Sequence, residues 1–190
     1  MPSVISVNVD TPYMDFGELA DAFAAGEEIR VATAGVNSAG HTAVELIRSY
    51  TGIEYTHLTY DGGNPAVIAT VGGEADAVPQ LSVEQVDMIR AGQLRPLAVL
   101  ADKPLEIEGV EEPIPPITNW IPEFEAAPIY FGIFVPAGVP EEVISTLEAI
   151  WEDHVITSDV LAQWARENAV VFDPAYGDEA FRKSFPMVQI

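Results

Sequence analysis

Hydrophobic and polar positions in the first hundred residues follow two alternating patterns. Short runs of β-branched and apolar residues predict strands over 4–9, 29–33, 55–60, 75–79 and 94–100. Between them, apolar residues spaced three and four apart predict helices over 15–25, from Gly40 to near Gly52, over 65–72 and over 83–91. Strands that alternate with short helices require crossover connections, so we predict an α/β fold with a mostly parallel sheet flanked by helices.

The pattern changes after Ala101. Residues 102–125 are rich in proline and acidic side chains and predict a loop or lid rather than a regular element. The rest of the chain predicts an aromatic strand over 129–135, helices over 141–155 and 159–168, and a last short strand over 169–172.

Composition and charge narrow the functional classes. The 190 residues include 30 acidic and 8 basic side chains, giving a net charge of −22, and 48% of residues are hydrophobic. This apolar content excludes a disordered chain, and the scarcity of basic residues leaves no basic stripe for nucleic acid. Cysteine is absent, which excludes disulfides. Such a surface remains soluble when salt screens its self-repulsion, so we expect a halophilic or salt-adapted protein; an ordinary acidic protein is the alternative.

The loop from Gly35 to Gly40 is the first candidate site. It joins the carboxyl end of a strand, closed by Thr33, to the amino end of a helix, where open α/β sheets bind ligands. Its glycines allow close backbone approach, Asn37 tolerates unusual backbone angles, and Ser38 offers a hydroxyl. Free N–H groups and the helix dipole favour an anion there without any lysine, although a plain capped helix start explains the same residues.

A second loop of the same design, with Gly62, Gly63 and Asn64, follows the next strand. Taken alone, the residues of this loop are typical of an ordinary turn. The carboxyl ends of consecutive parallel strands lie at one edge of a sheet, so we expect the two loops to form a shared anion pocket.

Enzymatic alternatives have weaker support. Residues 36–40 resemble a nucleophile elbow, which makes an α/β serine hydrolase using Ser38 the alternative hypothesis, but Val36 replaces the first glycine and His41 is too close in sequence to be a triad base. The three histidines lack metal-ligand spacing, so no metal site is expected. Dinucleotide and phosphate-loop motifs are absent, and no cofactor is expected. A third hypothesis is an acidic interaction module without a small ligand.

Five segments in register resemble the solute receptors of tripartite tricarboxylate transporters, also called Bug receptors. They are Ser38-x-x-His41 with Ala43-x-Glu45-Leu46, then the segments 60–66, 72–76, 89–99 and 131–140. Asn37 departs modestly from the family, which often has glycine at that position. The family's amino-terminal stretch, with its own glycine-rich loop, has no counterpart here, so we expect Met1 to lie within a longer receptor.

The resemblance implies a receptor with two α/β lobes of the type II periplasmic-binding-protein class and a ligand cleft between them. This chain would supply an inter-lobe crossover strand (1–10), the second lobe (11–128), and a crossover strand with the carboxyl-terminal return segment of the incomplete first lobe (129–190). Family receptors bind small carboxylates through loop backbone groups, hydroxyls and ordered water. By this resemblance, the carboxylate loop holds Ser38, Ala39, Gly40 and His41, its neighbour holds Gly62, Gly63 and Asn64, and Gln80 faces the cleft.

The same resemblance implies a non-enzymatic protein with a small carboxylate as ligand and membrane permease subunits as partners. Family members are periplasmic or lipid-anchored, and a signal segment would belong to the missing part. We also expect the exposed apolar surface left by an incomplete lobe to drive formation of a homodimer.

Overall fold

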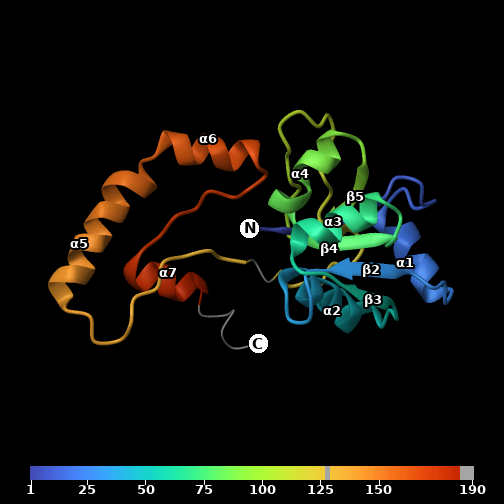
Figure 1. Cartoon of the computed structure of the whole chain (residues 1–190), viewed down its shortest axis with the longest axis horizontal. Helices are drawn as coiled ribbons and strands as arrows, with labels where there is room; N and C mark the ends of the chain where they lie inside the picture. The colour runs from blue at the N-terminus through green and yellow to red at the C-terminus, as the bar shows by residue number, and fades with distance from the viewer. Residues whose placement is uncertain (127–128, 185–190) are drawn as a thin grey trace.

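The computed structural model describes residues 1–126 and 129–184 (Figure 1). Its strands are β1 (Ser3–Asn8), β2 (Arg30–Thr33), β3 (Thr56–Thr59), β4 (Ala77–Leu81) and β5 (Leu94–Val99). Its α-helices are α1 (Phe16–Ala24), α2 (Ala39–Thr51), α3 (Gly63–Val71), α4 (Ser82–Arg90), α5 (Glu141–Trp151), α6 (Asp159–Glu167) and α7 (Gly177–Ser184), with a 3-10 turn η1 (Ile117–Asn119) and a π-helical turn η2 (Glu152–Ile156). The predicted α/β class is confirmed.

The strands form one sheet in the order β3-β2-β4-β1-β5. β2 pairs in parallel with β3 and β4, whereas β1 lies between β4 and β5 and pairs antiparallel with both. Four strands therefore end at one edge of the sheet, and β1 begins there. The run of β-forming residues over 4–9 predicts the existence of β1 but not its reversed direction, because direction depends on which distant strands it joins.

Helices cover both faces of this sheet. The apolar sides of α1 and α2 pack with Ile5 and Val31 on one face, and those of α3 and α4 pack with Val4 and Ala32 on the other. Successive residues of a strand point to opposite faces, which explains why neighbours such as Val4 and Ile5 belong to different cores. The loops at the strand ends are held in place because the helices that they join pack against both faces of the sheet.

Residues 102–125 are a loop, as predicted, but they do not form a lid. The segment folds back onto both cores and buries Ile107, Ile114, Ile117 and Phe124. Its prolines prevent a regular element, while its spaced apolar side chains attach it to the sheet.

The C-terminal arm, residues 129–184, extends away from the sheet and carries α5, η2, α6 and α7 (Figure 1). It is attached at its start, where backbone hydrogen bonds join Met1 and Ile129, and behind α6, where the Ser82 hydroxyl donates to the Ala169 carbonyl at 2.7 Å. None of the described helices is long and apolar enough to cross a membrane.

Two predicted strands in this arm are wrong. Residues 129–135 have no regular secondary structure, because a β-forming sequence needs a partner strand and their described backbone pairing is with Met1 alone. Residues 168–169 instead form a turn that ends α6, where Ala169 has a φ of 55° and the Val170 amide donates to Ala165 O at 2.8 Å, and residues 170–172 have no regular secondary structure. The short helix α7 is absent from the sequence prediction.

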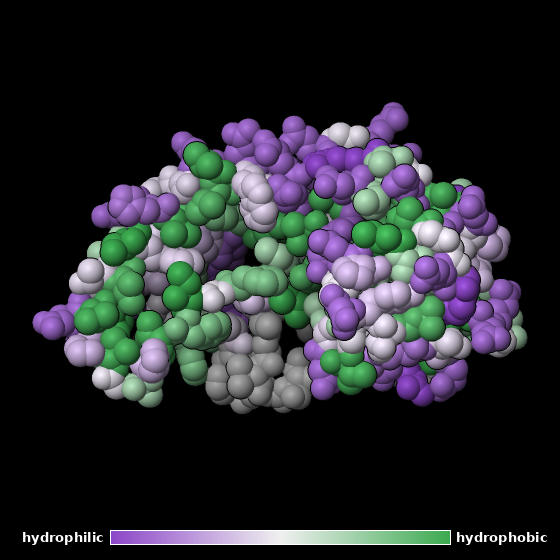
Figure 2. All heavy atoms as spheres, viewed as in Figure 1, coloured by the Kyte–Doolittle hydropathy of each residue, from purple (hydrophilic) through white to green (hydrophobic). Residues whose placement is uncertain are grey.

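Apolar side chains remain exposed along the arm. Figure 2 shows them gathered over this part of the molecule, and the most exposed include Ile133 at 78% and Phe134 at 83%. Neither α5 nor α7 has a buried residue. The arm therefore presents an amphipathic surface whose apolar side is not covered by the described residues.

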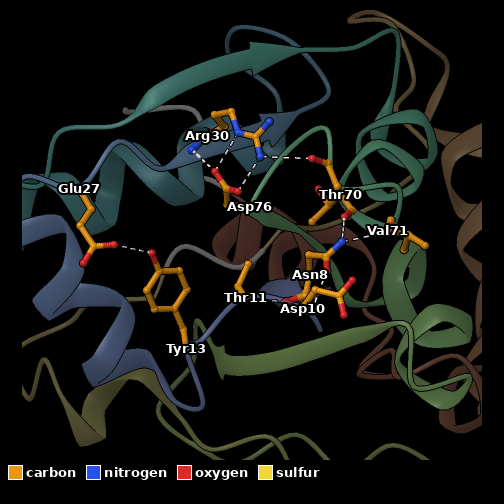
Figure 3. Close-up of polar contacts among 10 residues, drawn as sticks. Asn8, Asp10, Thr11, Tyr13, Glu27, Arg30, Thr70, Val71 and Asp76 are labelled. Carbon is orange, nitrogen blue, oxygen red and sulfur yellow. Dashed lines mark hydrogen bonds and ion pairs between the residues drawn. The ribbon is translucent and has the colours of Figure 1, made fainter.

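An ion pair between Arg30 and Asp76, hereafter the clasp, lies at the opposite edge of the sheet, where β2 and β4 begin (Figure 3). The Arg30 guanidinium donates to both Asp76 oxygens, at 3.0 and 2.7 Å, and the Arg30 backbone amide donates to the same carboxylate at 2.8 Å. Burial acts to raise the pKa of the Asp76 carboxyl, but the hydrogen bonds and charge of Arg30 outweigh it, so this pKa lies below its ordinary value. Beside the clasp, the Asn8 amide donates to Thr70 O at 2.7 Å.

We expect Asp76→Asn to lower the free energy of unfolding by about 1 kcal/mol at pH 7, since the bidentate pair is partly exposed. A depressed folded-state pKa stabilises the protein above the unfolded pKa of about 4, and this stabilisation is lost as the pH falls through the folded value. Urea unfolding at pH 7 and pH 3 measures the difference, which should shrink in acid. Asp87→Asn, at an exposed carboxylate 3.7 Å from Arg90, is the control and should change little; equal effects of the two substitutions would contradict the clasp.

Candidate functional site

The two predicted loops lie side by side at the edge where β2 and β3 end. Thr33 is paired with Thr59 in the parallel register, and the Tyr60 amide donates to Thr33 O at 2.9 Å. A Cβ placed on Gly35 would lie 3.9 Å from the Tyr60 carbonyl oxygen. The expected common edge is therefore confirmed.

The first loop, residues 34–38 and hereafter the entry loop, turns sharply into α2. Gly35 and Asn37 have positive φ angles of 105° and 63°, and the Ser38 amide donates to Gly35 O at 3.2 Å. Ser38 is the N-cap, and its Oγ accepts from the His41 amide at 3.2 Å. Within the described residues the amides of Ala39 and Gly40 have no acceptor, so they remain free donors at the positive end of the helix.

Gln80 lies directly against this helix start. Its side chain is 1% exposed, and both of its polar atoms lack a hydrogen-bond partner among the described residues. A Cβ on Gly40 would come within 2.3 Å of Gln80 Oε1 and 2.9 Å of Pro79 O, so only glycine fits there. An unpaired buried amide costs about 1–3 kcal/mol, so this side chain has a donor and an acceptor available for a polar ligand.

A cavity of about 420 Å³ borders the same helix start. Ala39 and Thr42 line it on one side, and Tyr130 and Trp151 of the C-terminal arm line it on the other. Asp102 also contributes to the wall. A negative guest would therefore be favoured near the amides of α2 and disfavoured toward the acidic wall.

The second loop differs from the first. Gly62 is the N-cap of α3 with a φ of 119° and provides no side-chain cap. The Glu84 carboxylate is packed against Gly63, where a Cβ would lie 2.0 Å from Glu84 Oε1, and it accepts from the Leu81 amide at 3.3 Å. Burial raises the pKa of Glu84. A carboxylate of the protein itself thus faces the start of α3, beside Gly63 and Asn64, which makes this loop less open to an anion than the entry loop.

Two histidines lie beside the entry loop, and the importance of one is missed by sequence analysis. His57 Nε2 is 2.6 Å from Thr33 Oγ1, and its ring stacks on His41 with centroids 4.8 Å apart. Burial and the charge of His41 lower the pKa of His57, partly offset by Glu45. The register of β3 against β2 is the signal that could have placed His57 at this edge. Among the described residues no group of three or more potential ligands could hold a metal ion.

Comparison with known proteins identifies the family of this chain. Residues 1–178 match the model of the tripartite tricarboxylate transporter family receptor. The chain belongs to this family. Its members are solute-binding receptors and not enzymes.

Relatives of this receptor chain are longer than the chain itself. It is 28% identical over 164 residues to a protein from the tcbD-tcbE intergenic region of a Pseudomonas species, covering 85% of this chain and 48% of that protein. Protein BugT of Bordetella pertussis is 27% identical over 144 residues, covering 75% of this chain and 43% of BugT. The chain thus spans about half the length of these curated relatives.

Solved structures share the fold of this receptor chain. An R. palustris protein solved with adipate has a TM-score of 0.82 at 22% identity, covering 99% of this chain and 62% of the other. A Rhodopseudomonas palustris protein with bound malate has a TM-score of 0.79 at 21% identity, covering 100% of this chain and 64% of the other. At these identities the similarity establishes the periplasmic-binding-protein fold alone.

The serine hydrolase alternative finds no support in this receptor. The Ser38 hydroxyl accepts from the backbone amide of His41 as a helix cap, and His41 Nδ1 lies 3.4 Å from the Asn37 amide. The imidazole is therefore not positioned as a base for Ser38, which a nucleophilic serine requires.

Proposed function

We propose that the chain forms part of an extracytoplasmic receptor that captures a small carboxylate at the start of α2. The observation that supports this most strongly is the buried Gln80 side chain beside the amides of Ala39 and Gly40, all of which lack a hydrogen-bond partner among the described residues. Together these groups offer donors to one carboxylate without a basic side chain. Small dicarboxylates are suitable probes because adipate and malate are bound in two structures of the same fold.

The remaining candidate residues have supporting roles in this proposal. Thr33, Gly35 and Asn37 shape the entry loop, Ser38 caps the helix, and His41 sits in its first turn. Gly62, Gly63 and Asn64 flank the site from the second loop. There, the Glu84 carboxylate would favour the hydroxyl or protonated end of a guest over a second ionised carboxylate.

The proposed organisation assigns 1–10 to an inter-lobe crossover strand, 11–128 to the second lobe, and 129–190 to the return segment of a first lobe. It is supported by the sheet core formed before residue 126 and by the exposed apolar side of the arm. The complete receptor would lie in the periplasm, with or without a lipid anchor, and deliver its ligand to permease subunits of the transporter. These partners follow from the family alone.

Ser38→Asp should weaken carboxylate binding at least about tenfold, since aspartate caps helices as well as serine does but puts a negative charge at the guest position. Ser38→Asn, an equally good cap without charge, is the matched control and should keep binding. Amide NMR titration with malate and adipate detects even millimolar affinity and should shift Ala39, Gly40 and His41. Equal affinity of the two variants, or shifts confined to another face, would refute the assignment.

We further propose that the arm's exposed apolar side drives pairing of two copies. Phe134→Glu should then shift the chain toward monomer, because it places a charge at a side chain that is 83% exposed in the arm. Light scattering after gel filtration measures the mass. Ile68→Glu, at an exposed residue of α3, is the control and should leave the mass unchanged; a wild-type monomer at high protein concentration would count against pairing.

Adaptation to high salt is proposed from the net charge of −22. Raising potassium chloride from about 0.1 to 1 M reduces the screening length from about 10 to 3 Å and should raise the melting temperature by several degrees. An equal osmolality of a neutral solute serves as the control, since it does not screen charge. A melting temperature that does not change with salt concentration would argue for an ordinary acidic protein.

A further inference from the structure

Thr33 connects His57 to the backbone of the entry loop. The Thr33 side chain is fully buried, and its Oγ1 is 2.6 Å from His57 Nε2. The same oxygen is 3.3 Å from both the amide and the carbonyl oxygen of Gly35. Gly35 O in turn accepts from the Ser38 amide at 3.2 Å, so a continuous path runs from His57 to the N-cap of α2.

The protonation of His57 determines how this path is connected. A hydroxyl has one hydrogen, which Thr33 gives either to an unprotonated His57 Nε2 or to Gly35 O. A charged His57 carries hydrogens on both ring nitrogens, so its Nε2 must donate to Thr33 Oγ1. The Thr33 hydrogen is then directed to Gly35 O, which ties the loop backbone to the end of β2.

His41 couples the same path to charge at the helix start. Its ring stacks on His57 at 4.8 Å, and two stacked imidazoles this close do not readily both carry a proton. His41 also belongs to the first turn of α2, together with the free amides. Between Arg30 and Arg90 the sequence has one lysine or arginine, Arg48, which pairs with Glu45 and Glu54. His41 and His57 are the other side chains of this stretch that can carry a positive charge.

The charged groups around the pair come from α2 and from the segment before β3. Glu45 accepts from the Tyr55 hydroxyl at 2.6 Å, which, with smaller contributions from Arg48 and His41, lowers the pKa of Glu45 despite partial burial. Arg48 is 3.6 Å from Glu45 and 2.7 Å from Glu54. β2 contributes the neutral Thr33. The low pKa of Glu45 therefore keeps its carboxylate ionised while His57 changes its protonation.

We propose, resting on the receptor function proposed above, that His57 is a positioning residue that acts on the entry loop through Thr33, and that the His41–His57 pair makes carboxylate binding strengthen as the pH falls. In the free protein, burial and His41 hold the pKa of His57 low. A bound carboxylate adds negative charge beside the pair and favours the protonated form of His57, which raises the pKa of His57. Binding then takes up a proton, so affinity rises as the pH falls between the bound and free values.

Positioning is tested without ligand. Histidine ring and backbone amide resonances are followed by NMR from about pH 8 to pH 5. The amides of Gly35 and Ser38 should titrate with the apparent pKa of His57, lose this titration in Thr33→Val, which removes only the hydroxyl, and regain it in Thr33→Ser. The positioning role would be overturned if the amide shifts of Gly35 and Ser38 did not follow the titration of His57, or if they followed it unchanged in Thr33→Val.

The pH dependence is tested by malate titration of the same chain between about pH 8 and pH 6, where ordinary carboxylates stay ionised. Affinity should rise about 3- to 10-fold from about pH 8 to pH 6, above the range in which malate itself takes up a proton. His41→Gln or His57→Gln should flatten this rise, whereas His154→Gln, at the third histidine, should keep it. Measurable binding with a flat profile overturns this inference and leaves the receptor proposal intact. Absence of binding at every pH contradicts the receptor proposal and the pH dependence together, while the ligand-free titration still decides the positioning role.

Discussion

The close packing of the first turn of α2 against the end of β4 is the contact on which the proposed site depends. Gly40 allows it, because any side chain at that position would overlap Gln80 and the backbone of Pro79. The contact brings the free amides of the helix beside a buried amide side chain that has no described partner. Neither group alone is specific for an anion, but together in a partly buried corner they offer several donors to one.

Local features of this corner were predictable from sequence, and non-local ones were not. Ser38 as N-cap and the turn at Gly35 follow from residue types whose preferences act within a few positions. The contact between His57 and Thr33 depends on strand register, and the Glu84 carboxylate beside Gly63 depends on how two helices pack. No periodicity within a single element contains that information, so the second loop looked equivalent to the first.

The errors in the C-terminal arm have a related cause. Residues 129–135 have the composition of a strand, but β propensity reflects packing against neighbours more than a preference of the backbone. Among the described residues, the backbone of Ile129 bonds to Met1 alone, and residues 129–135 join no sheet. In the same arm, Phe134 and the apolar side of α5 are exposed. This exposed apolar side is what the proposed organisation requires of a return segment from a lobe that the chain supplies only in part.

A protein with a net charge of −22 would be expected to repel a carboxylate, and the proposed site must overcome that repulsion. Distance from the surface carboxylates and screening by salt both reduce this repulsion at the site. At physiological ionic strength the screening length is about 8 Å, so most surface carboxylates contribute little at the start of α2. At the proposed site a ligand would contact the amides of Ala39 and Gly40 in a partly buried corner, where electrostatic interactions are stronger than in water. A charge on the His41–His57 pair would act over a similarly short range. High salt would weaken the long-range repulsion more than these short contacts, so an acidic surface and an anion site are compatible in one molecule.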